Sequence, residues 1–258
     1  MCYNLAYLEN KAKKLAARYQ GIFPPGWQHA LTLASGTDGL PSYYFVSGFS
    51  HPELAVVDSE GIQLMRWGLV PFWVKDQASA MNIQNKTLNA VGETVFQKPS
   101  FREPIKSRRC LLPVSGFFEW RDEGGLKQPY FIKTKTDDLF SLGCVYDRWT
   151  DKSTGEVMQG FSIITTRANE LMRHIHNKKQ RMPLILPTTD EAAWVDQSLK
   201  GSAVRDLIRP FMHDALEAYP VSRALNNPRT DRNTPEALVA VDVEDTPGKQ
   251  AGLFDGLE

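Results

Sequence analysis

The chain has 258 residues and a formal net charge of zero at pH 7, and 42% of its residues are hydrophobic and 10% aromatic. This composition is typical of a folded soluble protein with a good core, and the apolar runs fall far short of the roughly 20 residues that span a bilayer, so we expect no membrane segment. The zero net charge excludes binding to nucleic acid through bulk charge, so any such contact needs a local basic surface.

The three cysteines are too few and too scattered for a disulfide framework or a four-ligand zinc site. They are Cys2, Cys110 and Cys144. The sequence also lacks a glycine-rich phosphate loop and a His/Cys/Asp cluster with metal-ligand spacing. We therefore expect no metal and no other cofactor, and we expect a protein of the reducing cytoplasm.

The first half of the chain predicts a helix, a hairpin and several loops. Apolar residues at helical spacing predict a basic amphipathic helix over 5–19. Two strands over 53–58 and 62–67 are predicted to form a hairpin. An asparagine-rich loop is expected over 80–90, and a strand over 110–114 that continues through 116–120.

The second half contains more strands than helices. Strands are predicted over 129–135, 139–146, 160–165, 182–186 and 218–225, and helices over 169–175, 188–199 and 202–211. Because most strands follow one another directly, we expect an α+β fold in a single domain, built on one mixed or antiparallel sheet. After Asn226 the composition turns to Pro, Asp, Thr and Gly, which predicts a domain over 1–226 and a flexible C-terminal extension over 227–258.

Cys2 follows the initiator methionine directly, and nothing around it predicts a cleaved targeting peptide. Removal of Met1 would leave Cys2 with an α-amine and a thiol, whose ordinary pKa values are about 8 and about 8.5. An aldehyde that meets such an aminothiol can form an imine with the nitrogen and then close onto the sulfur as a thiazolidine. The alternative is an incidental buried thiol, which is the commoner state of a free cysteine.

Two further features of the sequence each allow two interpretations. Glu119 lies among large aromatic residues in Gly116-Phe117-Phe118-Glu119-Trp120. If Glu119 is inside, desolvation raises its pKa and makes it a candidate proton shuttle, whereas strict alternation would turn it toward water. Trp67 and Trp73, beside glycine and proline, fit either core positions or an exposed stacking surface.

Separate pieces of the sequence together resemble one family. They are Met1-Cys2, Trp67-Gly68 with Pro71, Asn89-Ala90 with Glu93-Thr94, Gly116 to Trp120, Ile175-His176 with Arg181-Met182-Pro183, and Pro220-Val221-Ser222. In this order, over residues 2 to about 226, they resemble the SOS response-associated peptidase family, also called abasic-site processing proteins.

The resemblance implies a sheet-rich, partly barrel-like single domain with flanking helices. It implies an enzyme of the bacterial cytoplasm, associated with the nucleoid during DNA damage, that acts as a monomer on single-stranded DNA at abasic sites. The processed Cys2 would form a thiazolidine with the sugar aldehyde and shield the lesion, and lyase and self-cleaving peptidase activities are implied as well.

The resemblance also assigns roles to three residues besides Cys2. Asn89 would hold the Cys2 amine or the sugar oxygen through hydrogen bonds. Glu119 would move protons during imine formation and ring closure. His176 would help to open the sugar hemiacetal, and its ordinary pKa of about 6.5 suits an acid or base.

The chain departs from its relatives where they commonly carry arginines: Tyr3-Asn4 follows Cys2, and Val91 follows Asn89-Ala90. Extra residues, Asn177 to Gln180, also separate His176 from Arg181. We therefore predict that other residues contact the DNA. The candidates are Trp73, Arg108, Arg109, Lys178, Lys179 and Arg181, with the cations of the Lys106–Arg109 cluster and Lys178–Lys179 replacing the missing phosphate contacts.

The C-terminal end predicts a protein partner. Gln250-Ala251-Gly252-Leu253-Phe254 is similar to the short peptides by which bacterial proteins dock on the sliding clamp, with Gln250, Leu253 and Phe254 as the contacting residues.

Two other function classes compete with the thiazolidine. An N-terminal-nucleophile amidohydrolase or peptidase would use the Cys2 thiol on an amide, with its own amine as the base. A DNA-binding module without chemistry would leave Cys2 inert. The first gives Glu119 and the tryptophans no task, and zero net charge speaks against the second.

Overall fold

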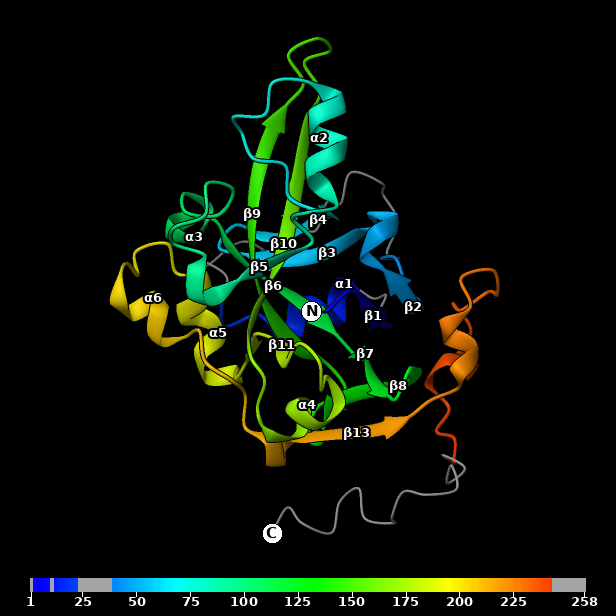
Figure 1. Ribbon diagram of the computed structural model, residues 1–258. Coiled ribbons are helices and arrows are strands. Elements are labelled where there is room, and N and C mark those ends of the chain that lie inside the picture. The colour runs from blue at the N-terminus through cyan, green and yellow to red at the C-terminus, as the bar shows by residue number, and fades with distance from the viewer. Residues whose placement is uncertain (1, 10–11, 23–38, 243–258) are drawn as a thin grey trace.

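The computed structural model describes residues 2–9, 12–22 and 39–242, and its strands form two sheets (Figure 1). The smaller sheet has five strands in the order β13-β8-β7-β1-β2, and every neighbouring pair is antiparallel. Its members are β1 (Asn4–Tyr7), β2 (Tyr43–Ser47), β7 (Gly116–Glu123), β8 (Leu126–Thr134) and β13 (Leu216–Pro220). Since β1 lies between β2 and β7, the start of the chain enters the sheet.

The larger sheet is mixed and curls into a closed ring. Its main order is β11-β10-β4-β3-β6-β9-β12, and the additional pairing of β9 with β10 closes the strands from β10 to β9 into a five-stranded barrel. Parallel pairs join β10 to β4 and to β5. The strands are β3 (Glu53–Asp58), β4 (Gly61–Trp67), β5 (Asn89–Val91), β6 (Arg109–Val114), β9 (Phe140–Thr150), β10 (Val157–Arg167), β11 (Arg181–Pro183) and β12 (Ile185–Leu186).

Short helices flank the sheets. In Figure 1, α3, α5 and α6 lie on one side of the barrel, and α2 lies beside the projecting β9–β10 hairpin. The α-helices are α1 (Ala12–Arg18), α2 (Gln77–Gln84), α3 (Pro104–Ser107), α4 (Glu170–Ile175), α5 (Thr188–Val195) and α6 (Ser202–Asp206). The 3₁₀ turns are η2 (Gly48–Ser50), η3 (Gly92–Thr94), η4 (His213–Ala215), η5 (Arg223–Asn226) and η6 (Pro235–Leu238). In the described part of the chain, no helix has the length and apolar character needed to cross a membrane.

The main core fills the barrel and the space under α4 and α5, and Trp67, Phe161 and Trp194 are fully buried in it. A second cluster lies on the smaller sheet, where Phe45, Phe118 and Phe131 pack with residues near the C-terminal end of the described chain. The α+β class and the partly barrel-like sheet predicted above are therefore confirmed.

Several element predictions differ from the structure. The strand expected over 218–225 ends at Pro220 and is followed by η5, and the helix expected over 202–211 ends at Asp206. The helix expected over 5–19 is a strand at its start, because Leu5, Ala6 and Tyr7 are all buried between neighbouring strands and show no alternation. The expected loop over 80–90 holds the end of α2 and the start of β5, with Asp76 capping the helix through a 2.8 Å hydrogen bond from the Ser79 amide.

Beyond residue 226 the described chain packs on the domain as far as Val241, whose amide donates to the Pro220 carbonyl, whereas the sequence predicts a flexible extension from residue 227. Ala237 is buried in the second cluster, and an isolated bridge joins Val221 to Ala240. The predicted clamp-docking residues Gln250, Leu253 and Phe254 lie outside the described residues.

Candidate active site and nucleic-acid interface

Cys2 is held beside Glu119 by the register of the first strand. Asn4 pairs with Phe118 in the antiparallel β1–β7 ladder, so the residues that precede Asn4 run alongside Glu119 and Trp120. The Cys2 side chain is fully buried. Burial, followed by the nearby Glu119 carboxylate, raises the pKa of the thiol well above its ordinary value. The thiol therefore stays protonated at neutral pH, and a base has to take its proton before the sulfur can attack.

Glu119 is inside the protein, which resolves the alternative that the alternation of β7 left open. Its side chain is 6% exposed, and burial raises the pKa of its carboxyl from 4.5 to about 7. A carboxyl with this pKa exists in both protonation states near neutrality, so it can donate a proton in one step and accept one in the next.

His176 follows α4 directly, and its ring is fixed by the backbone. Nδ1 lies 2.9 Å from the carbonyl oxygen of Arg181, which can only accept, so Nδ1 carries the proton and Nε2 is left as an acceptor. Nδ1 is also 3.6 Å from Oε1 of Glu119. Burial, together with nearby positive charge that includes Lys179, lowers the pKa of His176 to about 4. The imidazole is therefore neutral at pH 7 and is able to act as a base.

The extra residues after His176 fasten its loop to β7. The amide of Asp122 donates to Oδ1 of Asn177 over 3.2 Å, and Nδ2 of Asn177 donates back to the carbonyl of Asp122 over 2.9 Å. Lys178 forms a 2.8 Å ion pair with the same aspartate. From the neighbouring turn of α4, the His174 carbonyl accepts a hydrogen bond from Arg121. His176 is thus held against the strand that carries Glu119.

Asn89 begins β5 and carries a buried amide without partners. Among the described residues, neither Nδ2 nor Oδ1 of Asn89 has a hydrogen-bond partner, although the residue is only 9% exposed. A buried amide left in this state costs about 1–3 kcal/mol per unsatisfied group. Asn89, Ile163 and Cys144 occupy successive positions across β5, β10 and β9, and Cys144 contributes to the raised pKa of Cys2.

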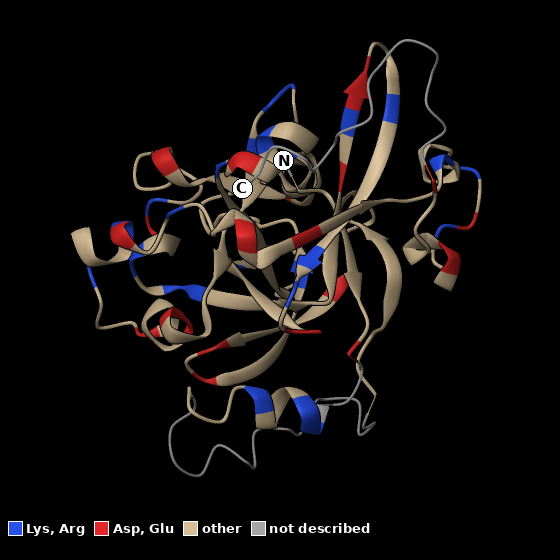
Figure 2. Ribbon diagram, turned by 90° about the horizontal axis from the view of Figure 1, so that it is seen from below, with Lys and Arg blue, Asp and Glu red and all other residues tan. Residues whose placement is uncertain are grey.

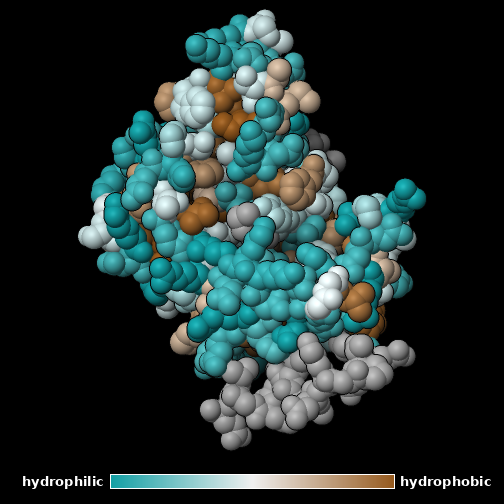
Figure 3. All heavy atoms as spheres, viewed as in Figure 1, coloured by the Kyte–Doolittle hydropathy of each residue, from teal (hydrophilic) through white to brown (hydrophobic). Residues whose placement is uncertain are grey.

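The structure places Trp67 in the core and leaves Trp73 exposed. Trp67 is fully buried, stacks on Phe161 and donates from Nε1 to the Leu88 carbonyl over 2.9 Å. Trp73 is 47% exposed beside Phe72, which is 58% exposed. Figure 3 shows hydrophobic patches in the upper part of the molecule, where α2 and the β9–β10 hairpin lie in Figure 1. Trp73 therefore offers a stacking surface and Trp67 does not.

The predicted contact between Arg109 and DNA is wrong. The Arg109 side chain is buried, with the residue only 2% exposed, and its guanidinium donates to backbone carbonyls that include those of Ile105 and Trp194. It therefore ties β6 to α3 and α5. Lys106, from the same cluster, pairs with Glu103.

Arg108 and Arg181, which are also predicted to contact DNA, each form an ion pair with an acidic residue. Arg108 is 30% exposed and pairs with Asp147. Both terminal nitrogens of Arg181 bond the carboxylate of Glu93 at 2.7 Å, so this guanidinium already has an anionic partner. Basic and acidic residues are interspersed over the molecule (Figure 2). Of the predicted cations, Arg108, Lys178 and Arg181 each form an ion pair with an acid.

A pocket of about 390 Å³ collects Glu119, His176 and several cations. Its lining includes Lys127, Lys178, Lys179 and Arg232, together with Tyr3, Asn4 and Trp120. Cys2 and Asn89 do not line this pocket. The structure thus brings Lys178 and Lys179 to the same opening as Glu119 and His176, and leaves the Lys106–Arg109 cluster elsewhere.

Lys127 and Arg232 are pocket residues that no sequence motif indicated. Lys127 follows an ordinary hairpin turn, and Arg232 falls in a stretch whose composition resembles a tail.

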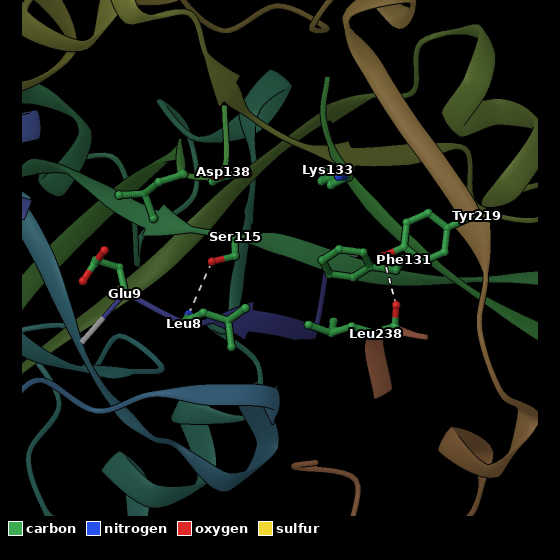
Figure 4. A pocket seen from close by; sticks show the side chains of 9 residues that line it. Leu8, Glu9, Ser115, Phe131, Lys133, Asp138, Tyr219 and Leu238 are labelled. Atoms are coloured by element: carbon green, nitrogen blue, oxygen red, sulfur yellow. Dashed lines mark hydrogen bonds between the residues drawn. The ribbon is translucent and has the colours of Figure 1, made fainter. Parts of the chain in front are cut away.

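A second pocket, of about 360 Å³, lies on another part of the smaller sheet and is lined by Leu8, Glu9, Ser115, Phe131, Lys133, Asp138, Leu139, Tyr219 and Leu238 (Figure 4). The Ser115 hydroxyl accepts from the Leu8 amide, and the Tyr219 hydroxyl donates to the Leu238 carbonyl. No residue assigned to the chemistry lines it. Within the described residues, no group of three or more His, Cys, Asp or Glu side chains could hold a metal ion.

Comparison with known proteins identifies the fold and the family. The chain is 35% identical over 209 residues to "Abasic site processing protein YoqW" of Bacillus subtilis, an alignment that covers 76% of this chain and 89% of that protein. It is 35% identical over 201 residues to "Abasic site processing protein HMCES" of Gallus gallus, covering 69% of this chain and 57% of that one. A crystal structure of a Bacteroides thetaiotaomicron protein superposes with a TM-score of 0.81 at 38% identity, covering 93% of this chain and 100% of that one.

The sequence profile of the family described as "SOS response associated peptidase (SRAP)" matches residues 1–228, which include Cys2, Asn89, Glu119 and His176. This chain therefore belongs to the SRAP family.

Proposed function

We propose that this protein processes abasic sites in single-stranded DNA by forming a thiazolidine through Cys2 after removal of Met1. The observation that carries the proposal is the buried Glu119 carboxyl, with a pKa of about 7, between the Cys2 strand and the His176 ring. The printed names of the relatives, abasic site processing proteins, support the same class of substrate.

The reaction begins with the opening of the sugar. Nε2 of the neutral His176 takes the proton of the C1′ hydroxyl while the C1′–O4′ bond breaks and O4′ gains a proton, which leaves an aldehyde at C1′. The Asn89 amide, which lacks a partner among the described residues, is suited to hold the sugar oxygen or the Cys2 amine.

Imine formation and ring closure then use both states of Glu119. The α-amine of Cys2 adds to C1′, and Glu119 protonates the hydroxyl of the carbinolamine, which leaves as water. The carboxylate next accepts the thiol proton, and the sulfur bonds C1′ of the iminium while the C=N π electrons return to the nitrogen, which keeps its own hydrogen. The product is a thiazolidine and one water molecule, with no oxidant or reductant required. Lyase and self-cleaving peptidase activities are further proposals of the same site.

The contacts to DNA come from the pocket and from the exposed aromatic segment. Lys179 lies near enough to lower the pKa of both Glu119 and His176, so a phosphate that it binds is next to the reacting groups. Lys178 binds a phosphate once its ion pair with Asp122 is broken. Arg108 and Arg181 do so once their ion pairs with Asp147 and Glu93 are broken. Trp73 stacks on an unpaired base beside the lesion.

The test is to mix the purified protein with single-stranded DNA that carries one abasic site, and to analyse the product by denaturing gel and intact mass. A stable adduct with the mass of the DNA plus the protein minus one water, absent in Cys2→Ala, is the expected result. Amide cleavage without an adduct would favour the N-terminal-nucleophile hydrolase. Retention without a covalent bond would leave only a binding module.

The same mass measurement reports whether Met1 has been removed. Expression in a host that lacks methionine aminopeptidase activity separates self-processing from processing by another enzyme.

We also propose that Gln250, Leu253 and Phe254 dock on the bacterial sliding clamp. A pull-down with the purified clamp should capture the full chain and lose it on deletion of residues 249–258. Equal capture of both chains would exclude these residues as the docking peptide.

A further inference from the structure

The chain continues beyond the family match, which ends at residue 228, and this continuation places a cation in the pocket of Glu119 and His176. Arg232 is half-buried there, near the start of the first strand, where the neutral Asn4 lines the same pocket. The pocket therefore has a wall that the family-matched region does not supply.

The segment that carries Arg232 is fixed at several points. The neighbouring Asn233 accepts hydrogen bonds from the Tyr44 amide at 2.8 Å and from the Phe45 amide at 3.4 Å, so it occupies the edge of β2. Further along, the Tyr219 hydroxyl donates to the Leu238 carbonyl, and Val241 donates to Pro220. Arg232 is thus presented by an anchored backbone.

The guanidinium of Arg232 lies over the ring of Phe45 and keeps its donors available. Its Cζ lies 4.6 Å from the centre of the Phe45 ring. A cation–π contact of this kind uses no N–H donor in a conventional hydrogen bond, and a guanidinium with unused donors suits bidentate binding of a phosphate. Within the described part of the chain, Arg232 has no hydrogen bond and no ion pair with a carboxylate.

The surrounding charge favours an anion. Lys127 and Lys179 line the same pocket, and neither forms an ion pair with a described residue. The acid Asp122 at this opening is already paired with Lys178 at 2.8 Å. Four cations thus face two acids, Asp122 and Glu119, among the described residues that line this pocket, and the excess of positive charge attracts a ligand that carries negative charge.

We propose that Arg232 binds a phosphate of the DNA strand next to the abasic site, as a specificity and positioning contact supplied by this chain's C-terminal continuation. This inference rests on the proposed function, because it takes the DNA strand as the occupant of the pocket.

The test measures binding to single-stranded DNA carrying a tetrahydrofuran site, which has no aldehyde and so cannot form the adduct. Affinity is measured over a range of salt for the wild type, Arg232→Gln and Arg232→Lys. The matched control is Arg229→Gln, which removes the same charge from an exposed position of the same segment outside the pocket lining. We expect the slope of log affinity against log salt to be flatter by about 0.7 in R232Q and unchanged in R232K and R229Q.

A second arm locates the phosphate. The phosphates that flank the site are replaced one at a time with uncharged methylphosphonate. One replacement should weaken binding of the wild type and leave R232Q unaffected. An R232Q slope equal to that of the wild type, or an equal loss in R229Q, would overturn the inference.

The two proposals fail separately. Adduct formation by the wild type with an unchanged R232Q slope sinks only the role of Arg232. A flattened R232Q slope in a protein that forms no adduct with a true abasic site sinks only the thiazolidine.

Discussion

Glu119 is the residue whose protonation the proposed chemistry uses twice. Its pKa of about 7 predicts that the rate of adduct formation changes near neutral pH, because the carboxyl must donate in one step and accept in the next. In Glu119→Gln we expect the rate to fall by about 10²–10⁴-fold and the break near pH 7 to disappear. Single-turnover kinetics from pH 5 to 9 (about two units on either side of that value) measure both. A break that persists in E119Q would assign it to another group.

The same residue should make the folded state sensitive to pH. The folded pKa of Glu119, about 7, exceeds its ordinary value of 4.5, so the folded state binds the proton more tightly, and stability is lost as pH rises through this window. One pKa unit is about 1.4 kcal/mol, so the effect is on the order of 3 kcal/mol.

His176 acts in the opposite direction, because its folded pKa of about 4 lies below its ordinary value of 6.5 and its stability contribution is lost as pH falls through that interval.

The raised pKa of Glu119 can be tested by urea unfolding of the wild type and E119Q at several pH values. E119Q should gain stability relative to the wild type as pH rises from 4.5 to about 7. A constant difference between the two proteins would contradict the raised pKa.

Substitution of Asn89 by an apolar residue should increase the stability of the protein and reduce its activity. Its buried amide lacks partners among the described residues, so Asn89→Leu, which has a similar volume and no polar atoms, should raise the free energy of unfolding by about 1–3 kcal/mol. The same substitution should reduce adduct formation. Denaturant titration and the adduct gel measure the two effects, and a loss of stability would mean that the amide is satisfied by a solvent molecule.

At the scale of elements, β4 ends on a core tryptophan, and the segment that follows it carries an exposed one. Trp73 is 47% exposed, so Trp73→Ala should weaken binding to single-stranded DNA by roughly 1–3 kcal/mol and leave the fold intact. Trp67 is fully buried, and Trp67→Ala should destabilise the protein by about 3–5 kcal/mol. Unchanged DNA affinity in W73A would remove this segment from the interface.

Local patterns predicted those elements whose residues alternate or whose ends carry a signal. The hairpin of β3 and β4 follows its alternation and its turn, and α4 begins after Asn169, whose side chain accepts from the Met172 amide. The strand β1 escaped prediction because both its faces are covered, so its residues carry no period. In the site, Glu119 and His176 could be proposed from motif and residue type, but Arg109 could not be recognised as interior, because one of its carbonyl partners, Trp194, lies on the distant α5.

At the scale of the whole molecule, the described chain beyond residue 228, which ends at residue 242, belongs to the folded unit. A chain ending at residue 242 retains the packed segment and serves as the reference. A chain ending at residue 228 should be less stable, since it removes Ala237 from Phe45 and uncovers the second cluster. Thermal or urea unfolding of the two chains checks this, and equal stability would show that the segment contributes only its pocket wall.

The position of β1 between β2 and β7 also limits how the protein can be handled. Cys2 is buried directly ahead of that strand, and an affinity tag fused to the amino end would convert the amine that the proposed reaction uses into an amide. Purification handles therefore belong at the carboxyl end, or must be released by a protease that leaves cysteine as the first residue.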